Sequence, residues 1–267
     1  MIKALYSFVK ENLFVQFRIL KALIFREIIT RYGRKNIGAF WLFLEPLIFT
    51  LGVSALWFLV KGIVSDQISP FAFALTGYST VLLWRNSSSR CVMAVEPNLA
   101  LMYHRNVNLI DVFLARLILE IIGVTISFFI LFAIFFFFGQ IDLPNDLMKV
   151  LIAWFLLAWF AIALGILVGS LSELFSFFER FWHPTTYILF PLSGALFFVS
   201  WLPGEFRELI LYFPFVHMVE LLREGFFGTV INEFYYDYSY FISFTLILSF
   251  VSVLVLSYLG KRISMHG

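Results

Sequence analysis

The sequence predicts an all-helical membrane protein that crosses a bilayer several times, and three observations support this fold class. Hydrophobic residues make up 61% of the 267 residues and charged residues only 13%, whereas soluble domains average about 25% charged residues. The apolar residues form long continuous runs, which favour transmembrane helices over the short alternating strands of a membrane barrel. Most of the basic residues lie outside these runs, and the others lie near their ends. A bilayer solvates this apolar surface, which one soluble core could not bury.

The first 37 residues form an N-terminal region with a helix prediction of its own. From Leu13 to Tyr32 apolar residues recur at spacings of three and four, with basic residues between them. This pattern predicts an amphipathic helix that lies along the cytoplasmic leaflet with its apolar face in the acyl boundary. Two interpretations stay open: a plain membrane anchor, or a frame that contacts a cytosolic partner and attracts an anionic lipid headgroup. The mixed, basic start of the chain predicts no cleavable signal peptide.

Residues 38–267 are predicted to form one transmembrane domain with six spans. Each apolar run is near the length of roughly 20 residues that a helix needs to cross the hydrocarbon core. The two halves show no repeat or inverted symmetry, which disfavours a repeat-type secondary transporter. The predicted spans are 38–60, 68–90, 112–138, 148–169, 185–202 and 240–259.

The segment between the last two spans, 203–231, is apolar but is not predicted to cross the membrane. Its central apolar run is short and is interrupted by Pro214, His217 and Glu220. All but four of the 19 Lys and Arg residues fall on one side of the six-span topology, which predicts that both termini are cytoplasmic. Because the number of crossings must then be even, we expect a re-entrant pair of short helices that dips into the outer leaflet and returns.

The sequence lacks the motifs of several enzyme classes. It contains no G-x-x-x-x-G-K-[ST] motif for a nucleotide-binding P-loop, and its four His residues are scattered. The single cysteine, Cys91, cannot form an internal disulfide or build a zinc site. The net charge of +2 gives no reason to expect a nucleic-acid partner. We therefore expect no metal, cofactor or ATP site in this chain, and the energy for transport would come from another polypeptide.

Two acidic residues fall inside predicted spans. Glu45 precedes Pro46 in the first span, and Glu120 lies in the third span, four residues after Arg116. Ionised carboxylates are costly in lipid and usually face a partner inside the bundle. The spacing favours an ion pair between Arg116 and Glu120 on one helix face over a gating or substrate role for Glu120.

Two connecting segments carry further signals. A proline preceded by an acidic residue predicts a short cytoplasmic helix over 97–103, between the second and third spans. On the opposite side of the membrane, aromatic residues are abundant around the predicted re-entrant pair. For Trp201, Tyr212 and Phe213 two interpretations stay open, an interfacial aromatic belt and a surface that stacks on sugar rings.

Several segments resemble a known family. The approach to the first span, with Arg31-Tyr32, Gly38, Trp41 and Pro46-Leu47, resembles that of type-2 ABC exporter permeases. The segment 183–194, HPTTYILFPLSG, is more specific, and it is followed by similar stretches at 201–203, 213–220 and 223–228. Together they are similar to the capsule polysaccharide export permeases of Gram-negative bacteria. The resemblance extends over essentially the whole chain.

This resemblance implies a function and a set of partners. Such permeases sit in the inner membrane as homodimers, with two copies of an ATP-binding subunit that holds ATP and Mg. With periplasmic and outer-membrane export proteins they move a finished, lipid-linked polysaccharide. Three alternatives stay open: export of O-antigen or a teichoic-acid-type glycan, a membrane-embedded glycan-processing enzyme, and a drug or small-lipid exporter.

The resemblance and the chemistry of the residues also suggest three groups of site residues. Arg85 and Arg90, in a polar tract at the cytoplasmic end of the second span, form our candidate receptor for an anionic headgroup. The residues implied in coupling to the ATP-binding subunit are Arg26, Arg31, Tyr32, Pro97, Asn98, Leu99, Tyr103 and Arg105. The candidate substrate-receiving or channel residues are Arg85, Arg90, Ser88, Trp41 and Glu120. The candidate periplasmic gate comprises Trp201, Pro203, Tyr212, Phe213, Pro214 and His217.

Overall fold

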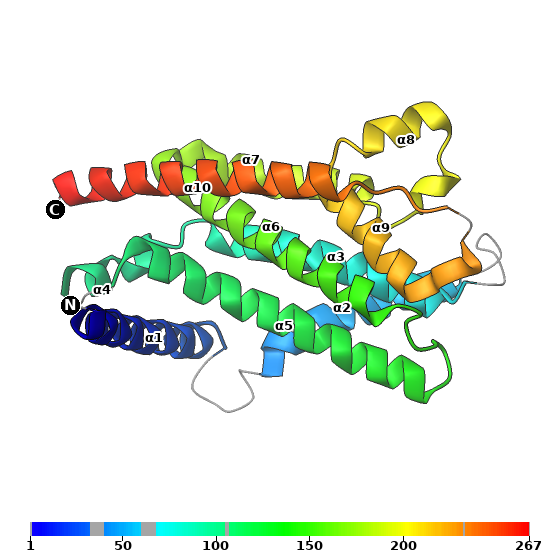
Figure 1. The fold of residues 1–267 in the computed structure, drawn as a ribbon, viewed down its shortest axis with the longest axis horizontal. Helices are drawn as coiled ribbons and strands as arrows, with labels where there is room; N and C mark the ends of the chain where they lie inside the picture. The colour runs from blue at the N-terminus through cyan, green and yellow to red at the C-terminus, as the bar shows by residue number, and fades with distance from the viewer. Residues whose placement is uncertain (1, 33–39, 60–67, 105–106, 232, 267) are drawn as a thin grey trace.

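The computed structural model describes residues 2–32, 40–59, 68–104, 107–231 and 233–266, and over these ranges it is helical throughout (Figure 1). The α-helices are α1 (Ile2–Tyr32), α2 (Trp41–Leu59), α3 (Pro70–Cys91), α4 (Leu99–His104), α5 (Leu109–Phe137), α6 (Leu147–Leu174), α7 (Ser176–Leu189), α8 (Gly204–Ile210), α9 (Pro214–Phe227) and α10 (Tyr238–His266). Short 3₁₀ turns at Glu96–Asn98, Pro191–Ser193, Val199–Trp201 and Gly228–Val230 join some of them.

Helices α3 and α6 form the centre of the bundle. α2, α5 and α9 pack on α3, while α5, α9 and α10 pack on α6. α3 is buried from Ala72 to Trp84 although it is rich in small and polar residues. Its threonine hydroxyls donate hydrogen bonds to backbone carbonyls in the preceding turn of the helix; the Thr76 hydroxyl, for example, donates to the Ala72 carbonyl at 2.8 Å. Small side chains therefore let neighbouring helices approach closely, while these threonine hydroxyls keep a hydrogen-bond partner within α3.

The outer helices carry apolar side chains on their exposed faces. Phe250 on α10 is 65% exposed, and Ile247 is exposed to the same extent. Large apolar surfaces of this kind are stable in lipid and not in water. Among the described residues three helices are long and apolar enough to cross a membrane, within Leu109–Phe137, Leu147–Leu174 and Tyr238–Ile263. The prediction of an all-helical, polytopic membrane protein is confirmed at this level.

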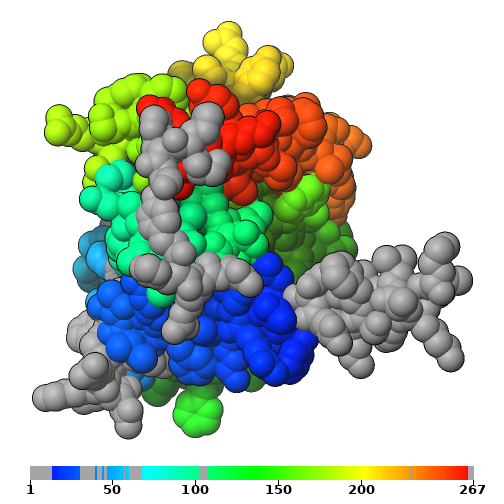
Figure 2. Space-filling view, turned by 90° about the vertical axis from the view of Figure 1, so that its left-hand side faces the viewer, coloured from blue at the N-terminus to red at the C-terminus, as the bar shows by residue number. Residues whose placement is uncertain are grey.

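Helix α1 lies at the end of the bundle where the C-terminal end of α10 also lies (Figure 1). Figure 2 shows it across the lower part of that end face. The helix is longer than the predicted Leu13–Tyr32 segment, and among its described side chains only Leu23 is buried, with 7% exposure. The large apolar side chains of Phe17 and Phe25 are exposed, while Glu27 of the same helix pairs with Arg116 of α5. The placement of this helix along the leaflet stays a prediction.

The predicted fifth span, 185–202, is not one helix, and this prediction was wrong. α7 begins earlier, at Ser176, and ends at Leu189 after 14 residues. Pro191 has no N–H to continue the helix, and Gly194 adopts a left-handed φ of 77°. The chain then runs through two 3₁₀ turns to Trp201. Apolar composition alone did not reveal this break.

The segment between α7 and α10 contains two short helices, as the interruption of its apolar run predicts. α8 and α9 meet at a tight turn before Pro214, which takes the first position of α9. α9 is buried over most of its length, and the Trp84 ring of α3 stacks on Phe215 with centroids 5.0 Å apart. Figure 1 shows α8 projecting from the bundle at the end opposite α1. The re-entrant path of this pair in a membrane stays a prediction.

Candidate functional site

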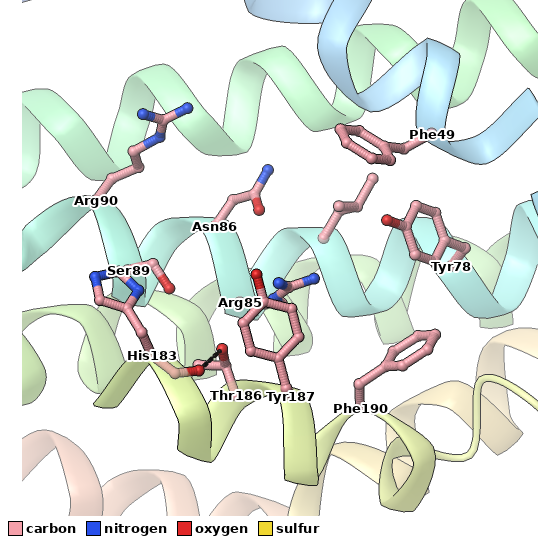
Figure 3. Close-up of a pocket in the computed structure, with 11 residues that line it drawn as sticks. Phe49, Tyr78, Arg85, Asn86, Ser89, Arg90, His183, Thr186, Tyr187 and Phe190 are labelled. Carbon is pink, nitrogen blue, oxygen red and sulfur yellow. Dashed lines mark hydrogen bonds between the residues drawn. The ribbon is translucent and has the colours of Figure 1, made fainter. Parts of the chain in front are cut away.

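A cavity of about 550 Å³ lies between α2, α3 and α7 (Figure 3). Its size is within the range of about 300–1,000 Å³ that is usual for small-ligand sites. Its wall combines basic, amide and hydroxyl groups with aromatic rings. The lining residues are Phe49, Tyr78, Leu82, Arg85, Asn86, Ser89, Arg90, His183, Thr186, Tyr187 and Phe190.

Helical spacing explains why these side chains share one wall. On α3, the polar residues Arg85, Asn86, Ser89 and Arg90 fall one turn apart and are half-exposed, while Ser87 and Ser88 between them are buried. On α7, the lining residues 183, 186, 187 and 190 follow the spacing of three and four that places residues on one helix face. The two helices thus present facing polar and aromatic surfaces.

The cavity carries positive charge. The Arg85 guanidinium carbon lies 4.4 Å from the centre of the Tyr187 ring, which faces it from α7 (Figure 3). Among the described residues no carboxylate pairs with Arg85. Arg90 is different, because its Nε lies 3.4 Å from Glu120 Oε1 on α5. A guanidinium supported by an aromatic ring and open to a cavity suits a carboxylate or phosphate ligand.

Only some of the predicted substrate-receiving residues line the cavity. Arg85 and Arg90 line the cavity. Glu120 does not line it but pairs with Arg90. Ser88 is fully buried and does not line the cavity; its hydroxyl donates to the Arg85 carbonyl at 3.0 Å. The Trp41 side chain lies outside the described part of the structure.

The predicted ion pair between Arg116 and Glu120 is corrected by the structure. Arg116 Nε lies 2.9 Å from Glu27 Oε1 of α1, and Glu120 pairs with Arg90 of α3. Both side chains thus find their partners on neighbouring helices. The spacing of four residues was a local signal, and tertiary neighbours provide the observed contacts.

Sequence reasoning missed more than half of the cavity wall. The unpredicted lining residues are Phe49, Tyr78, Leu82, His183, Thr186, Tyr187 and Phe190. The spacing on α7 could have been recognised, but the predicted span began at 185 and left His183 outside. No local signal shows that α7 faces the polar end of α3.

The two segments predicted to couple to a partner subunit lie against each other. Arg26 of α1 donates to the Asn98 side chain and, at 3.0 Å, to the Pro97 carbonyl. Leu99 begins α4 directly after this turn, as predicted for the short cytoplasmic helix. The side chains of Arg31, Tyr32 and Tyr103, and all of Arg105, lie outside the described residues.

The predicted gate residues gather at the opposite end of the bundle. Trp201 stacks on Phe73 of α3 with centroids 5.7 Å apart. Tyr212 is 75% exposed, and the neighbouring Phe213 ring stacks on Phe215. Pro203 immediately precedes α8, and Pro214 starts α9. The group therefore outlines α8 and the turn that follows it.

His217 holds this turn to the start of α10. Its Nδ1 accepts a hydrogen bond from the Asp237 N–H at 2.9 Å, so Nε2 carries the proton and donates to the Leu211 carbonyl at 2.8 Å. The His217 ring also packs on Tyr240, whose hydroxyl donates to the Tyr212 carbonyl at 2.7 Å. His217 is buried and connects chain segments; it does not face a ligand.

Replacing His217 with phenylalanine should loosen the turn between α8 and α9. The variant keeps an aromatic ring but leaves the Asp237 N–H and the Leu211 carbonyl without this partner, at a cost of about 1–3 kcal/mol. Hydrogen exchange of residues 204–213 should accelerate. The control is Tyr212→Phe, which removes only an exposed hydroxyl. Equal exchange in both variants would contradict the connecting role of His217.

Comparison with known proteins places this architecture in a family. The ABC-2 type transporter family matches residues 18–227. The capsule polysaccharide export inner-membrane protein CtrC of Neisseria meningitidis serogroup B is 44% identical over 219 residues, 82% of this chain and 83% of the relative. The capsule polysaccharide export inner-membrane protein BexB of Haemophilus influenzae is 41% identical over 222 residues, 83% of this chain and 84% of the relative.

A more distant relative extends over more of the chain. The polysialic acid transport protein KpsM of Escherichia coli is 27% identical over 239 residues, which cover 90% of this chain and 92% of the relative. The family match covers most of the helical bundle, including α3 and α7 of the cavity. From this match and the relatives at 41% and 44% identity, we conclude that the chain belongs to the ABC-2 type transporter family of membrane proteins.

Proposed function

We propose that this chain is the membrane permease of an ATP-driven exporter that moves a lipid-linked, capsule-type polysaccharide across the bacterial inner membrane. The relatives named as capsule export proteins support the substrate class. ABC-2 permeases work with an ATP-binding subunit and are not themselves enzymes. In this proposal two copies of the permease form a homodimer with two copies of the ATP-binding subunit, which binds ATP and Mg.

The cavity between α2, α3 and α7 is the observation that carries the proposed function. Arg85 has no carboxylate partner among the described residues, and it lies beside aromatic rings and hydroxyl groups. This combination suits the charged end of a lipid-linked glycan, since arginine binds carboxylates and phosphates bidentately and rings stack on sugar faces. The cavity is proposed as the place where this end of the substrate is received.

The orientation in the membrane follows from the same proposal. The end of the bundle with α1, α4 and the C-terminal end of α10 faces the cytoplasm, where Arg26, Pro97 and Asn98 lie on the surface that contacts the ATP-binding subunit. The opposite end, with α8 and α9, faces the periplasm and forms the gate. Periplasmic and outer-membrane export proteins then receive the polysaccharide.

The direct test is deletion of the gene in its host, with staining for surface polysaccharide and an assay for polymer retained inside the cell. Loss outside with accumulation inside is expected for an exporter. Loss in both places would point to an enzyme of glycan synthesis. Loss of an O-antigen or teichoic-acid-type glycan with normal capsule would reassign the substrate.

Replacing Arg85 with glutamine should lower export about tenfold, since hydrogen bonds to charged groups contribute about 1.5–3 kcal/mol. The measurement is surface polysaccharide in the deletion strain complemented with each variant, normalised to the amount of permease in the membrane. Arg180→Gln is the matched control, because Arg180 is an exposed arginine of α7 that does not line the cavity. Equal export by the two variants would contradict the role proposed for Arg85.

A further inference from the structure

A series of contacts made by charged side chains connects the predicted coupling residues Arg26, Pro97 and Asn98 to the cavity. It starts on α1, where Arg26 holds the turn at Pro97 and Asn98. The next residue, Glu27, pairs with Arg116 of α5 at 2.9 Å. Both side chains are largely shielded, with exposures of 17% and 14%. Helix α1 is therefore joined to α5 by an ion pair that lies next to the predicted coupling residue Arg26.

Arg116 then reaches the end of α3. Its Nη1 donates to the Arg90 carbonyl at 2.9 Å. α3 ends at Cys91, so this carbonyl belongs to the last turn, where backbone oxygens have no partner within the helix. Arg116 thus contacts α1 and α3 at the same time: its Nε forms an ion pair with Glu27, and its Nη1 donates a hydrogen bond to the Arg90 carbonyl.

The series ends at the cavity wall. The Arg90 side chain is 37% exposed and lines the cavity, while its Nε lies 3.4 Å from the buried carboxylate of Glu120. Glu120 stands one helical turn after Arg116 on α5, so the same short stretch of α5 holds both the backbone and the side chain of Arg90. The position of this cavity arginine thus depends on α5 and, through Arg116, on α1.

Helix α1 has little other anchoring in the described residues. Leu23 is its only buried side chain there, so apolar packing fixes its position weakly. The directed contacts of Arg26 and Glu27 fix its position along the bundle more strongly. A displacement of α1 by a docked partner would therefore act on Arg116 first.

We infer that Glu27 and Arg116 are positioning residues. They link the predicted coupling residues of α1 to the cavity, because they make the position of Arg90 depend on the position of α1. This inference rests on the proposed function, because it requires an ATP-binding partner at α1 and a substrate in the cavity. Coupling between two sites is reciprocal. Substrate in the cavity should therefore change the affinity of the ATP-binding subunit for α1 through the same contacts.

The test uses the full complex with its ATP-binding subunit, with ATP hydrolysis measured in lipid vesicles and export measured in cells. Glu27→Gln removes the charge of the pair and keeps the size of the side chain. We expect export to fall about fivefold or more, within the usual range of coupling effects, while the amount of complex and its ATP hydrolysis stay within about twofold. The control is Glu179→Gln, which removes a carboxylate of α7 away from these contacts.

Two further variants keep the test decisive. Arg116→Lys retains the charge but lacks the fork that reaches both partners, so it should lower export with the complex intact. The double variant Glu27→Gln with Arg90→Gln should lower export less than the product of the two single effects, because the inferred role of Glu27 is to position the Arg90 side chain that the second substitution removes. Additive effects, a parallel loss of export and hydrolysis, or unchanged export in Glu27→Gln would overturn the inference. If the inference is overturned but Arg85→Gln still lowers export, the proposed function stands. If Arg85→Gln leaves export unchanged as well, both the inference and the proposed function fail.

Discussion

Replacing Arg223 with methionine is expected to unfold the end of the bundle that carries α8 and α9. Arg223 is the largest charged side chain in the described core, with 0% exposure. Its guanidinium donates to the carbonyls of Gly194 at 2.6 Å, Ala195 at 2.8 Å and Phe197, and it lies over the Phe73 ring at 4.2 Å. One side chain thus satisfies three carbonyls of the connection 194–197 that follows α7.

The expected cost follows from what the variant leaves behind. Three carbonyls lose their donor, and Glu220, fully buried one turn earlier on α9, loses the nearby positive charge. Removing one member of a buried charge pair costs about 3–5 kcal/mol. We expect little Arg223→Met protein in the membrane and a much lower thermal unfolding midpoint of the detergent-solubilised chain.

Two comparison variants separate the causes. Arg207 also donates to carbonyls of this connection, at 3.2 Å for Leu202 and 3.4 Å for Ser200, but it is only half-buried. Arg207→Met should therefore cost clearly less than Arg223→Met. Adding Glu220→Gln to Arg223→Met should restore part of the stability, because it removes the uncompensated charge. An equal loss for Arg207→Met and Arg223→Met would show that burial of the arginine does not decide the effect.

The helices of the bundle were predictable where the signal is local. An apolar run of about 20 residues, the length that the bilayer imposes, marks α5, α6 and α10. Their observed first residues lie within three positions of the predicted ones, whereas α6 and α10 continue past the predicted ends, to Leu174 and His266. The end of α7 was not predictable in this way. Residues on both sides of Pro191 and Gly194 are apolar, so the hydropathy of this segment does not reveal that the backbone hydrogen bonds of the helix stop there.

The candidate site was predictable only from the α3 side. Arg85 and Arg90 interrupt an otherwise apolar segment, and that interruption is visible in the sequence. The facing Tyr187 lies on another helix, more than 100 positions later in the sequence, so its contact with Arg85 is a property of the packed bundle. The same reason explains why Arg90, and not Arg116, pairs with Glu120. Local spacing favours one partner, and helix packing supplies another.

Replacing Gly77 with alanine is expected to destabilise the protein, although alanine is the better helix former. Gly77 lies inside α3, where the exchange would normally stabilise by about 1 kcal/mol. A Cβ at this position would lie only 2.4 Å from the Ala195 carbonyl oxygen and 2.7 Å from Arg223 Nη2. The clash involves backbone that is itself held by Arg223, so it cannot be relieved by rotating a side chain.

Overpacking of this kind costs about 1–3 kcal/mol, and here it should also weaken the bonds from Arg223 to the 194–197 connection. We expect a lower unfolding midpoint for Gly77→Ala and faster hydrogen exchange at 194–201. The matched control is Gly52→Ala in α2, where a Cβ would meet no atom within 4 Å. This variant should be as stable as the parent or more so. If the two alanines shift the midpoint in the same direction, helix propensity and not the close approach of α3 to this connection governs the position.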